Sequence, residues 1–146
     1  MRSLKSRSGY EPALRPNMYS KQVAEHIASP QNVGEVENPS GVGDVTNQVC
    51  MDRIRLTVRI VDGVISEAKF KANGCPPTLA AGSVLTLLIA GQSVSRARSL
   101  SRTDIAGALG RLPAAKMHCA MLAVDALAAA LDSSENDLRS GILASD

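Results

Sequence analysis

Aromatic residues are almost missing from this chain of 146 residues, which contains one Phe, two Tyr and no Trp. The hydrophobic fraction is nonetheless 45%, so the core must be built from aliphatic side chains. Proteins that bind single-stranded nucleic acid without sequence preference stack bases on aromatic side chains. The scarcity of aromatic residues therefore argues against that class of binding surface.

A strong excess of charge is also missing. The formal net charge is +2, and the Lys and Arg residues are scattered rather than clustered. Proteins that bind the phosphate backbone usually carry a clustered basic face, so nucleic acid is not expected as a partner. No uninterrupted apolar run approaches the roughly 18 residues of a membrane span. The basic N-terminal segment lacks the apolar centre of a secretory signal, so we expect a cytoplasmic protein with no membrane partner.

Cysteine is scarce and odd in number, with three residues in the whole chain. Thiols stay reduced in a reducing compartment, which argues against a disulfide framework. Metal or thiol chemistry is therefore the more informative interpretation of these residues.

The clearest local pattern predicts a β-hairpin. Polar and apolar residues alternate over 53–60, Asp62-Gly63 is a turn signal, and a further strand is predicted over 64–71. Alternation along that strand predicts one shared face for four residues: Val64, Ser66, Ala68 and Phe70.

The remaining elements complete a mixed fold. A weaker strand is predicted over 43–49, and helices are predicted over 19–28, 78–90, 94–100, 103–109, 114–131 and 134–143. The order predicts an α+β fold, a small antiparallel three-stranded β-sheet with helices packed on one face. The expected division is a flexible tail over 1–17, the folded domain over 18–133, and a C-terminal helix or tail over 134–146.

The three cysteines all fall at predicted element ends. Cys50 follows the first strand, Cys75 lies at a strand-to-helix junction, and Cys119 opens the long helix beside His118. Because loops converge at one tip of such a domain, we expect these residues to meet, together with Asp52. Three thiolates with one nitrogen or carboxylate make a tetrahedral set for Zn²⁺. Thiolates, with an occasional histidine, also hold iron–sulfur clusters.

Two questions stay open at this level. Ligand softness suits both zinc and iron–sulfur clusters, so the residue types do not decide between them. A cysteine in an apolar chain is also often a small buried hydrophobe, and none of the three has the C-x-x-C spacing that would be strong evidence by itself.

Several motifs, in family order over most of the chain, carry a resemblance to a known family. They are Tyr19-Ser20-Lys21 with His26, Pro30-Gln31-Asn32-Val33-Gly34, Gly43-Asp44-Val45, Cys50-Met51-Asp52, Phe70-Lys71-Ala72-Asn73-Gly74-Cys75 and Lys116-Met117-His118-Cys119-Ala120. On these motifs the chain resembles the IscU/NifU N-terminal family of iron–sulfur cluster assembly scaffolds. The resemblance implies a carrier without catalytic residues, on which Cys50, Cys75 and Cys119 bind the cluster, with Asp52 and His118 as auxiliary ligands.

The resemblance also implies a working cycle. Such a scaffold receives sulfur from a cysteine desulfurase, takes up iron, builds a transient [2Fe–2S] cluster and passes it to recipient apo-proteins. It further implies that the purified protein can carry Zn²⁺ in place of iron.

Three departures from the family pattern bear on this implication. Met51 stands where the family usually has Gly, and we expect it to restrict its loop and to cover the site with an apolar side chain. Pro76-Pro77 follows Cys75 and should stiffen that ligand. In the segment 112–116, which resembles the family's site for an Hsp70-type chaperone, Ala114 replaces the second proline and weakens that inference.

Two alternatives remain beside the scaffold. The first is a zinc-bound Suf-type sulfurtransferase, in which Zn²⁺ fixes the thiols and one of them accepts persulfide sulfur. Those relatives carry an insertion between the second and third cysteines, whereas here the separation is 119 − 75 = 44 positions, as in the form without it. The second is a structural module whose cysteines only pack, and Met51 is its best support.

Other residues of these motifs are interpreted as structural. His26 is expected to be partly packed, and Met117 and Met121 are expected to cover the core or the site. The alternating arginines of the second strand should form one polar face, suited to solvent or to an acidic partner.

Overall fold

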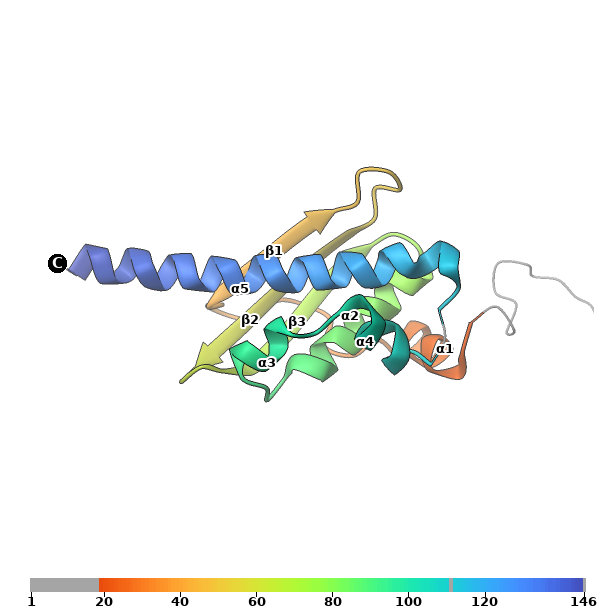
Figure 1. Ribbon diagram of the computed structural model, residues 1–146, viewed down its shortest axis with the longest axis horizontal. Helices are drawn as coiled ribbons and strands as arrows, with labels where there is room; N and C mark the ends of the chain where they lie inside the picture. The colour runs from red at the N-terminus through yellow and green to blue at the C-terminus, as the bar shows by residue number, and fades with distance from the viewer. Residues whose placement is uncertain (1–18, 111, 146) are drawn as a thin grey trace, which may run out of the picture.

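The computed structural model describes residues 19–110 and 112–145, so the predicted tail over 1–17 lies outside the described residues. The elements in chain order are α1 (Lys21–Ala28), β1 (Gly41–Thr46), β2 (Arg53–Val61), β3 (Val64–Asn73), α2 (Pro76–Ile89), α3 (Val94–Arg98), α4 (Arg102–Ala108), the 3₁₀ turn η3 (Ala114–Lys116) and α5 (Met117–Ser145). The strands form one antiparallel sheet in the order β1-β2-β3, with α2 and α5 packed against it (Figure 1). The predicted α+β fold is confirmed.

The β2–β3 hairpin has the predicted turn. Asp62 and Gly63 have φ angles of 54° and 76°, and a two-residue type I′ turn requires positive φ at both positions. The pairing runs the full length of both strands and ends with Arg53 opposite Asn73. This last pair determines which residues meet just beyond the sheet.

A β-bulge in β3 changes which residues face the core. The register of β2 and β3 shifts by one residue at Ser66, and an additional residue reverses the side on which its neighbours lie. Ala68 and Phe70 are buried as predicted. The expected placement of Val64 and Ser66 on the same face is wrong, because both are exposed and Ile65 is buried instead.

The segment between α1 and β1 covers part of the outer face of the sheet. Val33 forms a parallel bridge with Phe70 at the edge of β3. Val36 is buried, and its N–H donates to the hydroxyl of the fully buried Thr57 at 2.9 Å. The turn-rich stretch predicted here is therefore held against the sheet by backbone and hydroxyl contacts.

Helix α5 lies across β1 and β2 at close range because glycines and alanines meet there. A Cβ built on Gly41 would lie 2.2 Å from the Ala130 carbonyl oxygen, and one on Gly43 would lie 2.0 Å from that of Ala126. No side chain fits in that space, so the two glycines set the distance between helix and sheet. This contact positions the start of α5, where His118 and Cys119 lie.

The predicted break near residue 134 is wrong. Helix α5 continues without interruption to Ser145, and its C-terminal part extends beyond the sheet (Figure 1). Ser134 does not end the helix because its hydroxyl donates to the Leu131 carbonyl oxygen at 2.8 Å, within the helix itself. The division of the chain into a domain and a C-terminal segment stays a prediction.

One described helical stretch, Ala114–Glu135, is long and apolar enough to span a membrane by length and composition, with a mean hydropathy of 1.4. Within its most apolar 18 residues 44% are buried inside the protein, and α5 packs against the sheet, α2 and α4. A helix packed in a protein core can be equally long and apolar, so packing accounts for the apolar composition of this stretch.

We predict that Gly43→Ala destabilises the fold, because the added Cβ would overlap the Ala126 carbonyl. The cost should be about 1–3 kcal/mol, as for other overpacked sites, measured by urea unfolding. Gly107→Ala is the matched control, since nothing lies within 4 Å of its Cβ position in α4. That change should stabilise by about 0.5–1 kcal/mol, and equal effects of the two substitutions would contradict the packing argument.

Candidate metal centre

The end of the β2–β3 hairpin brings together residues that are distant in sequence. Because Arg53 pairs with Asn73, the next residues outward, Asp52 and Gly74, are neighbours. Gly74 has a φ of 144°, and a Cβ built on it would lie 2.4 Å from the Asp52 carboxyl carbon. Glycine therefore lets the carboxylate lie directly against the backbone that leads to Cys75.

Four of the five predicted ligands form one compact group. The ligand atoms of Asp52, Cys75, His118 and Cys119 all lie within 4.8 Å of one another. The two sulfurs are 3.5 Å apart, and the Cys75 sulfur is 3.2 Å from Asp52 Oδ2. His118 Nε2 is 3.6 Å from the Cys119 sulfur and 3.8 Å from Asp52 Oδ2.

These separations fit a single metal ion. Metal–ligand bonds in tetrahedral zinc sites put ligand atoms about 3.3–3.8 Å apart along the tetrahedron edges. Four of the six ligand pairs have separations between 3.2 and 3.8 Å. Two sulfurs, one imidazole and one carboxylate form a donor set suited to zinc or iron. The ligand assignment itself stays a prediction.

The ring of His118 is oriented for this role. Its Nδ1 lies 3.1 Å from the Ala115 carbonyl oxygen, which can only accept a hydrogen bond, so Nδ1 carries the proton. In the neutral form of the ring the lone pair is then on Nε2, which lies toward Cys119 and Asp52. Metal-binding histidines commonly have their second nitrogen fixed by such a bond.

The carboxylate of Asp52 is buried but well supplied with donors. The Thr78 hydroxyl donates to Oδ2 at 2.7 Å, and the Cys75 thiol donates to the same oxygen at 3.2 Å. Burial raises the pKa of Asp52, but these hydrogen bonds, together with those from the Cys75 N–H and the Cys50 side chain, outweigh burial, so the pKa lies below its usual value. Asp52 is therefore ionised, as a metal ligand must be.

Sequence reasoning missed Thr78. This residue is fully buried between the ligands, three positions after Cys75 on α2. Residues three apart lie on the same side of a helix, so the spacing from Cys75 was the available signal. In the sequence Gly74 is only one residue of a motif, and its role as the backbone neighbour of Asp52 follows from the sheet register.

Cys119 and Cys50 have opposite environments. Burial raises the pKa of the Cys119 thiol to about 12, with neighbouring Cys75 and Asp52 adding to the rise and Thr78 opposing it. Cys50 is exposed and stands outside the group of four. The structure therefore leaves the fifth predicted ligand outside the group of four but beside it, since a hydrogen bond from Cys50 helps to lower the pKa of Asp52.

Cys50 lies in a short loop between β1 and β2. Asn47 organises the loop, since its side-chain oxygen accepts from the N–H groups of Val49 and Cys50 at 2.8 and 3.0 Å. Met51 has a φ of 65°, in the left-handed region that favours glycine. The Met51 side chain is 65% exposed, and its expected covering of the site stays a prediction.

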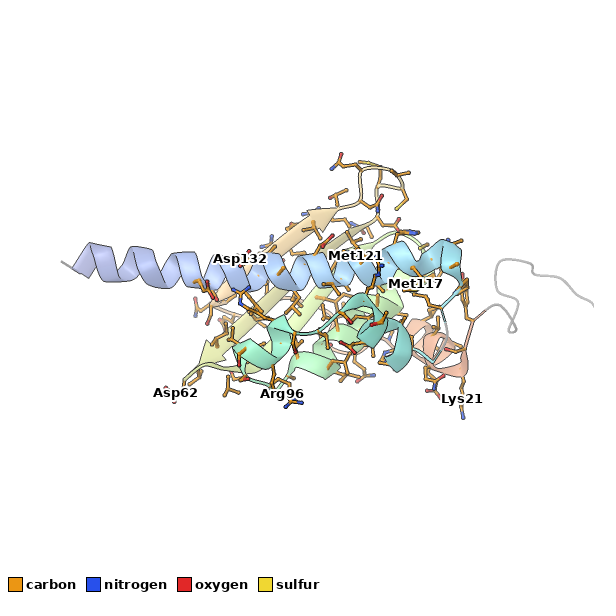
Figure 2. The ribbon with its side chains drawn as sticks, in the orientation of Figure 1. Lys21, Asp62, Arg96, Met117, Met121 and Asp132 are labelled. Atoms are coloured by element: carbon orange, nitrogen blue, oxygen red, sulfur yellow. The ribbon has the colours of Figure 1, made fainter. Side chains whose placement is uncertain are left out.

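A groove of ≈ 600 Å³ adjoins the group on the side of α5. It is lined by residues that include His118, Val45 and Leu122. Met117 and Met121 also line it, and Figure 2 shows both on the same side of α5. The two methionines therefore flank the site and do not belong to its ligand group.

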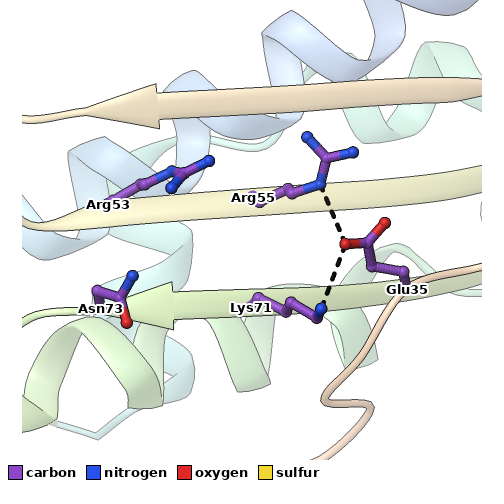
Figure 3. A pocket seen from close by; sticks show the side chains of 5 residues that line it. All are labelled: Glu35, Arg53, Arg55, Lys71 and Asn73. Carbon is purple, nitrogen blue, oxygen red and sulfur yellow. Dashed lines mark ion pairs between the residues drawn. The ribbon is translucent and has the colours of Figure 1, made fainter.

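A second hollow, of ≈ 360 Å³, lies on the outer face of the sheet (Figure 3). Glu35 pairs there with Arg55 at 3.4 Å and with Lys71 at 3.3 Å, while Arg53 pairs with Asp44 at 2.5 Å. A hydrogen bond from Lys71 lowers the pKa of Glu35, and one from Arg53 lowers that of Asp44. These cations already have carboxylate partners, and the described lining holds no soft metal ligand.

His26 is structural, as interpreted from the sequence. Its Nδ1 lies 2.6 Å from the hydroxyl of Ser83, a buried residue of α2. The same hydroxyl accepts from the Gln31 N–H at 2.8 Å. The motif residues before β1 therefore attach α1 and its following loop to α2, away from the group of four.

Comparisons with known proteins agree on one family. The sequence model of the NifU-like N-terminal domain matches residues 18–137. The chain is 40% identical over 114 residues to the iron–sulfur cluster assembly scaffold protein IscU 1 of Archaeoglobus fulgidus, which covers 78% of this chain and 74% of that protein. It is 38% identical over 117 residues to the scaffold protein IscU of Escherichia coli K12, covering 77% and 91%.

A solved structure shows the same fold. The crystal structure of a NifU-like protein (N-terminal) from Brucella abortus superposes with a TM-score of 0.67, covering 82% of this chain and 96% of that one. At 18% sequence identity this likeness concerns the fold alone.

We predict that the three thiols react with iodoacetamide in the order of their exposure. Cys50 should react first, since it is exposed, and Cys119 last, since it is buried and its pKa of about 12 keeps it protonated at pH 8. Peptide mass spectrometry of the metal-free protein measures each rate. Cys50→Ser should remove the fast phase. Equal native-state rates for Cys50 and Cys119 would contradict the difference in exposure between these two thiols.

We also predict that Met51→Asn stabilises the protein by about 0.5–1 kcal/mol, because asparagine tolerates the left-handed region better than methionine. Met51 is largely exposed, so little burial is lost. Thermal unfolding measures the gain. Val49→Asn is the control in the same loop, at a residue without positive φ, and a similar gain there would show that backbone strain is not the cause.

Proposed function

We propose a detailed function for this chain, which belongs to the family of NifU-like N-terminal domains. The resemblance predicted from its motifs is confirmed. The protein is a scaffold on which iron–sulfur clusters are assembled, a carrier rather than an enzyme with its own turnover reaction. The observation that carries the detailed proposal is the group of four ligands with an exposed thiol beside it.

The buried group is proposed to take the first iron. Cys75, Cys119, His118 and Asp52 are already close enough to surround one ion, so little rearrangement is needed. A [2Fe–2S] cluster needs four protein ligands, usually thiolates. The third thiolate must come from Cys50, so its loop has to move toward the group as the cluster forms.

The exposed Cys50 is proposed to receive the sulfur. A cysteine desulfurase would present a persulfide, and the Cys50 thiolate would attack its outer sulfur. The new S–S bond forms on Cys50, and the desulfurase cysteine leaves as a thiolate. Two electrons from an external donor then reduce each transferred sulfur to sulfide. Exposure of Cys50 supports this step, because the donor must reach the acceptor directly.

The finished cluster is proposed to pass to recipient apo-proteins. Asp52 is a harder base than a thiolate and binds iron less firmly, so it is the natural point of ligand exchange. The exposed Met51 and Val49 flank Cys50 and leave this end of the molecule accessible. Recognition by an Hsp70-type chaperone stays a prediction, weakened by Ala114, and so does the cytoplasmic location.

One observation favours the zinc-bound sulfurtransferase as a second candidate. The group of four is a complete tetrahedral set without Cys50, which suits Zn²⁺ and leaves one thiol free to accept sulfur. The two candidates share the acceptor step and differ in what the site finally holds.

Anaerobic purification followed by metal and labile-sulfide analysis tests the proposal. After incubation with a cysteine desulfurase, cysteine, ferrous iron and a reductant, the scaffold should hold iron and sulfide in equal amounts. One zinc per chain with a persulfide on Cys50 would support the second candidate. A protein that binds neither metal nor sulfur would contradict both.

We predict that Asp52→Ala lengthens the life of the reconstituted cluster severalfold. Removal of the hard carboxylate leaves His118 Nε2, a known type of cluster ligand, as the fourth donor. The decay of visible absorbance in the presence of a chelator measures the lifetime. Asp125→Ala, which removes an exposed carboxylate outside the ligand group, should leave it unchanged. An unchanged or shorter lifetime for Asp52→Ala would contradict the exchange role.

A further inference from the structure

Thr78 is a buried polar residue to which neither the motifs nor the comparisons assign a role. Its side chain is fully inaccessible to solvent in the first turn of α2. Its hydroxyl oxygen lies 2.7 Å from Asp52 Oδ2, 3.2 Å from the Cys119 sulfur and 3.4 Å from the Cys75 sulfur. One hydroxyl therefore touches three of the four members of the ligand group.

The hydroxyl has a single proton, so its acceptors compete. The carboxylate oxygen is the nearest acceptor and carries negative charge, which makes this the strongest of the three bonds. Asp52 Oδ2 has a second lone pair, and the hydrogen bond leaves that pair available to a metal. The bond can therefore persist when the site is loaded.

The other side-chain support of Asp52 within the group cannot persist in this way. The Cys75 thiol donates to Oδ2 at 3.2 Å, but a sulfur that binds a metal does so as a thiolate and has no proton to donate. Gly74 places backbone against the carboxylate and offers it no side-chain donor. The Cys75 N–H also donates to the carboxylate and can persist, whereas the Cys50 thiol, which donates to it as well, cannot donate once its sulfur binds a metal. Thr78 is then the side chain that continues to hold the carboxylate in the loaded site.

We propose that Thr78 is a positioning residue that holds Asp52 in the ligand group and so sets how firmly this ligand takes part in metal binding. The inference rests on the proposed function, because it assumes that Asp52 is a ligand. Helix α2 supports such a role, since Thr78 belongs to the same rigid turn as Cys75 and its side chain is locked by burial. One hydroxyl thereby holds Asp52, just before β2, next to Cys75, the N-cap of α2.

Anaerobic titration with Co²⁺ tests the proposal, with affinity and the visible spectrum as readouts. All proteins carry Cys50→Ser, so that the exposed thiol cannot replace Asp52 as a ligand. Thr78→Val removes the hydroxyl and keeps the branched shape, Thr78→Ser keeps the hydroxyl, and Thr78→Ala is the second variant if valine does not fold. Thermal unfolding without metal confirms that each protein is folded.

Thr78→Val should weaken Co²⁺ binding about tenfold, the usual effect of losing a group that orients a ligand. Its ligand-field spectrum should shift toward that of Asp52→Ala, and Thr78→Ser should restore both affinity and spectrum. In an Asp52→Ala background, Thr78→Val should cost nothing further, because the residue acts through Asp52.

Three outcomes would overturn the inference or its premise, and they are distinguishable. If Asp52→Ala leaves affinity and spectrum unchanged, the ligand role of Asp52 fails, and the inference fails with it. If Asp52→Ala weakens binding but Thr78→Val does not, only the role of Thr78 fails. If Thr78→Val costs as much in the Asp52→Ala background as it does when Asp52 is present, the hydroxyl acts on the thiolates or on packing, and the positioning of Asp52 is refuted.

Discussion

The pairing of β2 with β3 is the constraint on which the site depends. A strand register is discrete, so the pair Arg53 and Asn73 leaves one arrangement for the residues just beyond it. Asp52 then lies against Gly74, and Cys75 follows as the first residue before α2. A slip of one residue in this hairpin would separate the carboxylate from the sulfur, whatever the rest of the chain did.

The site combines a rigid part with a loose part, and this division suits a carrier. Thr78 and Cys119 belong to helices that pack against the sheet, and Cys75 is the N-cap of α2, so their positions are held by the core. Cys50 is in an exposed loop whose own hydrogen bonds come from Asn47 rather than from the core. The rigid ligands can bind the metal while the exposed Cys50 exchanges sulfur with a partner.

Local patterns predicted the fold well because they depend on neighbouring residues. The alternation over β2, the Asp62-Gly63 turn and the proline-led start of α2 all act within a few residues, and each appears as expected. The bulge at Ser66 has no comparable local signal, so the face of Val64 was assigned wrongly. The same holds for residue 134, where serine is typical of a break but its hydroxyl bonds within α5.

The sequence by itself determined which donor atoms this protein has and, through its motifs, the family to which it belongs. Only the tertiary structure decided which donors meet: four of five are together, Cys50 is outside, and Thr78 is among them. It also decided that Met51 is largely exposed to solvent. The reason is physical, because residue chemistry is a property of each position, whereas distances between Asp52, Cys75 and Cys119 depend on a strand register and a helix packed against glycines.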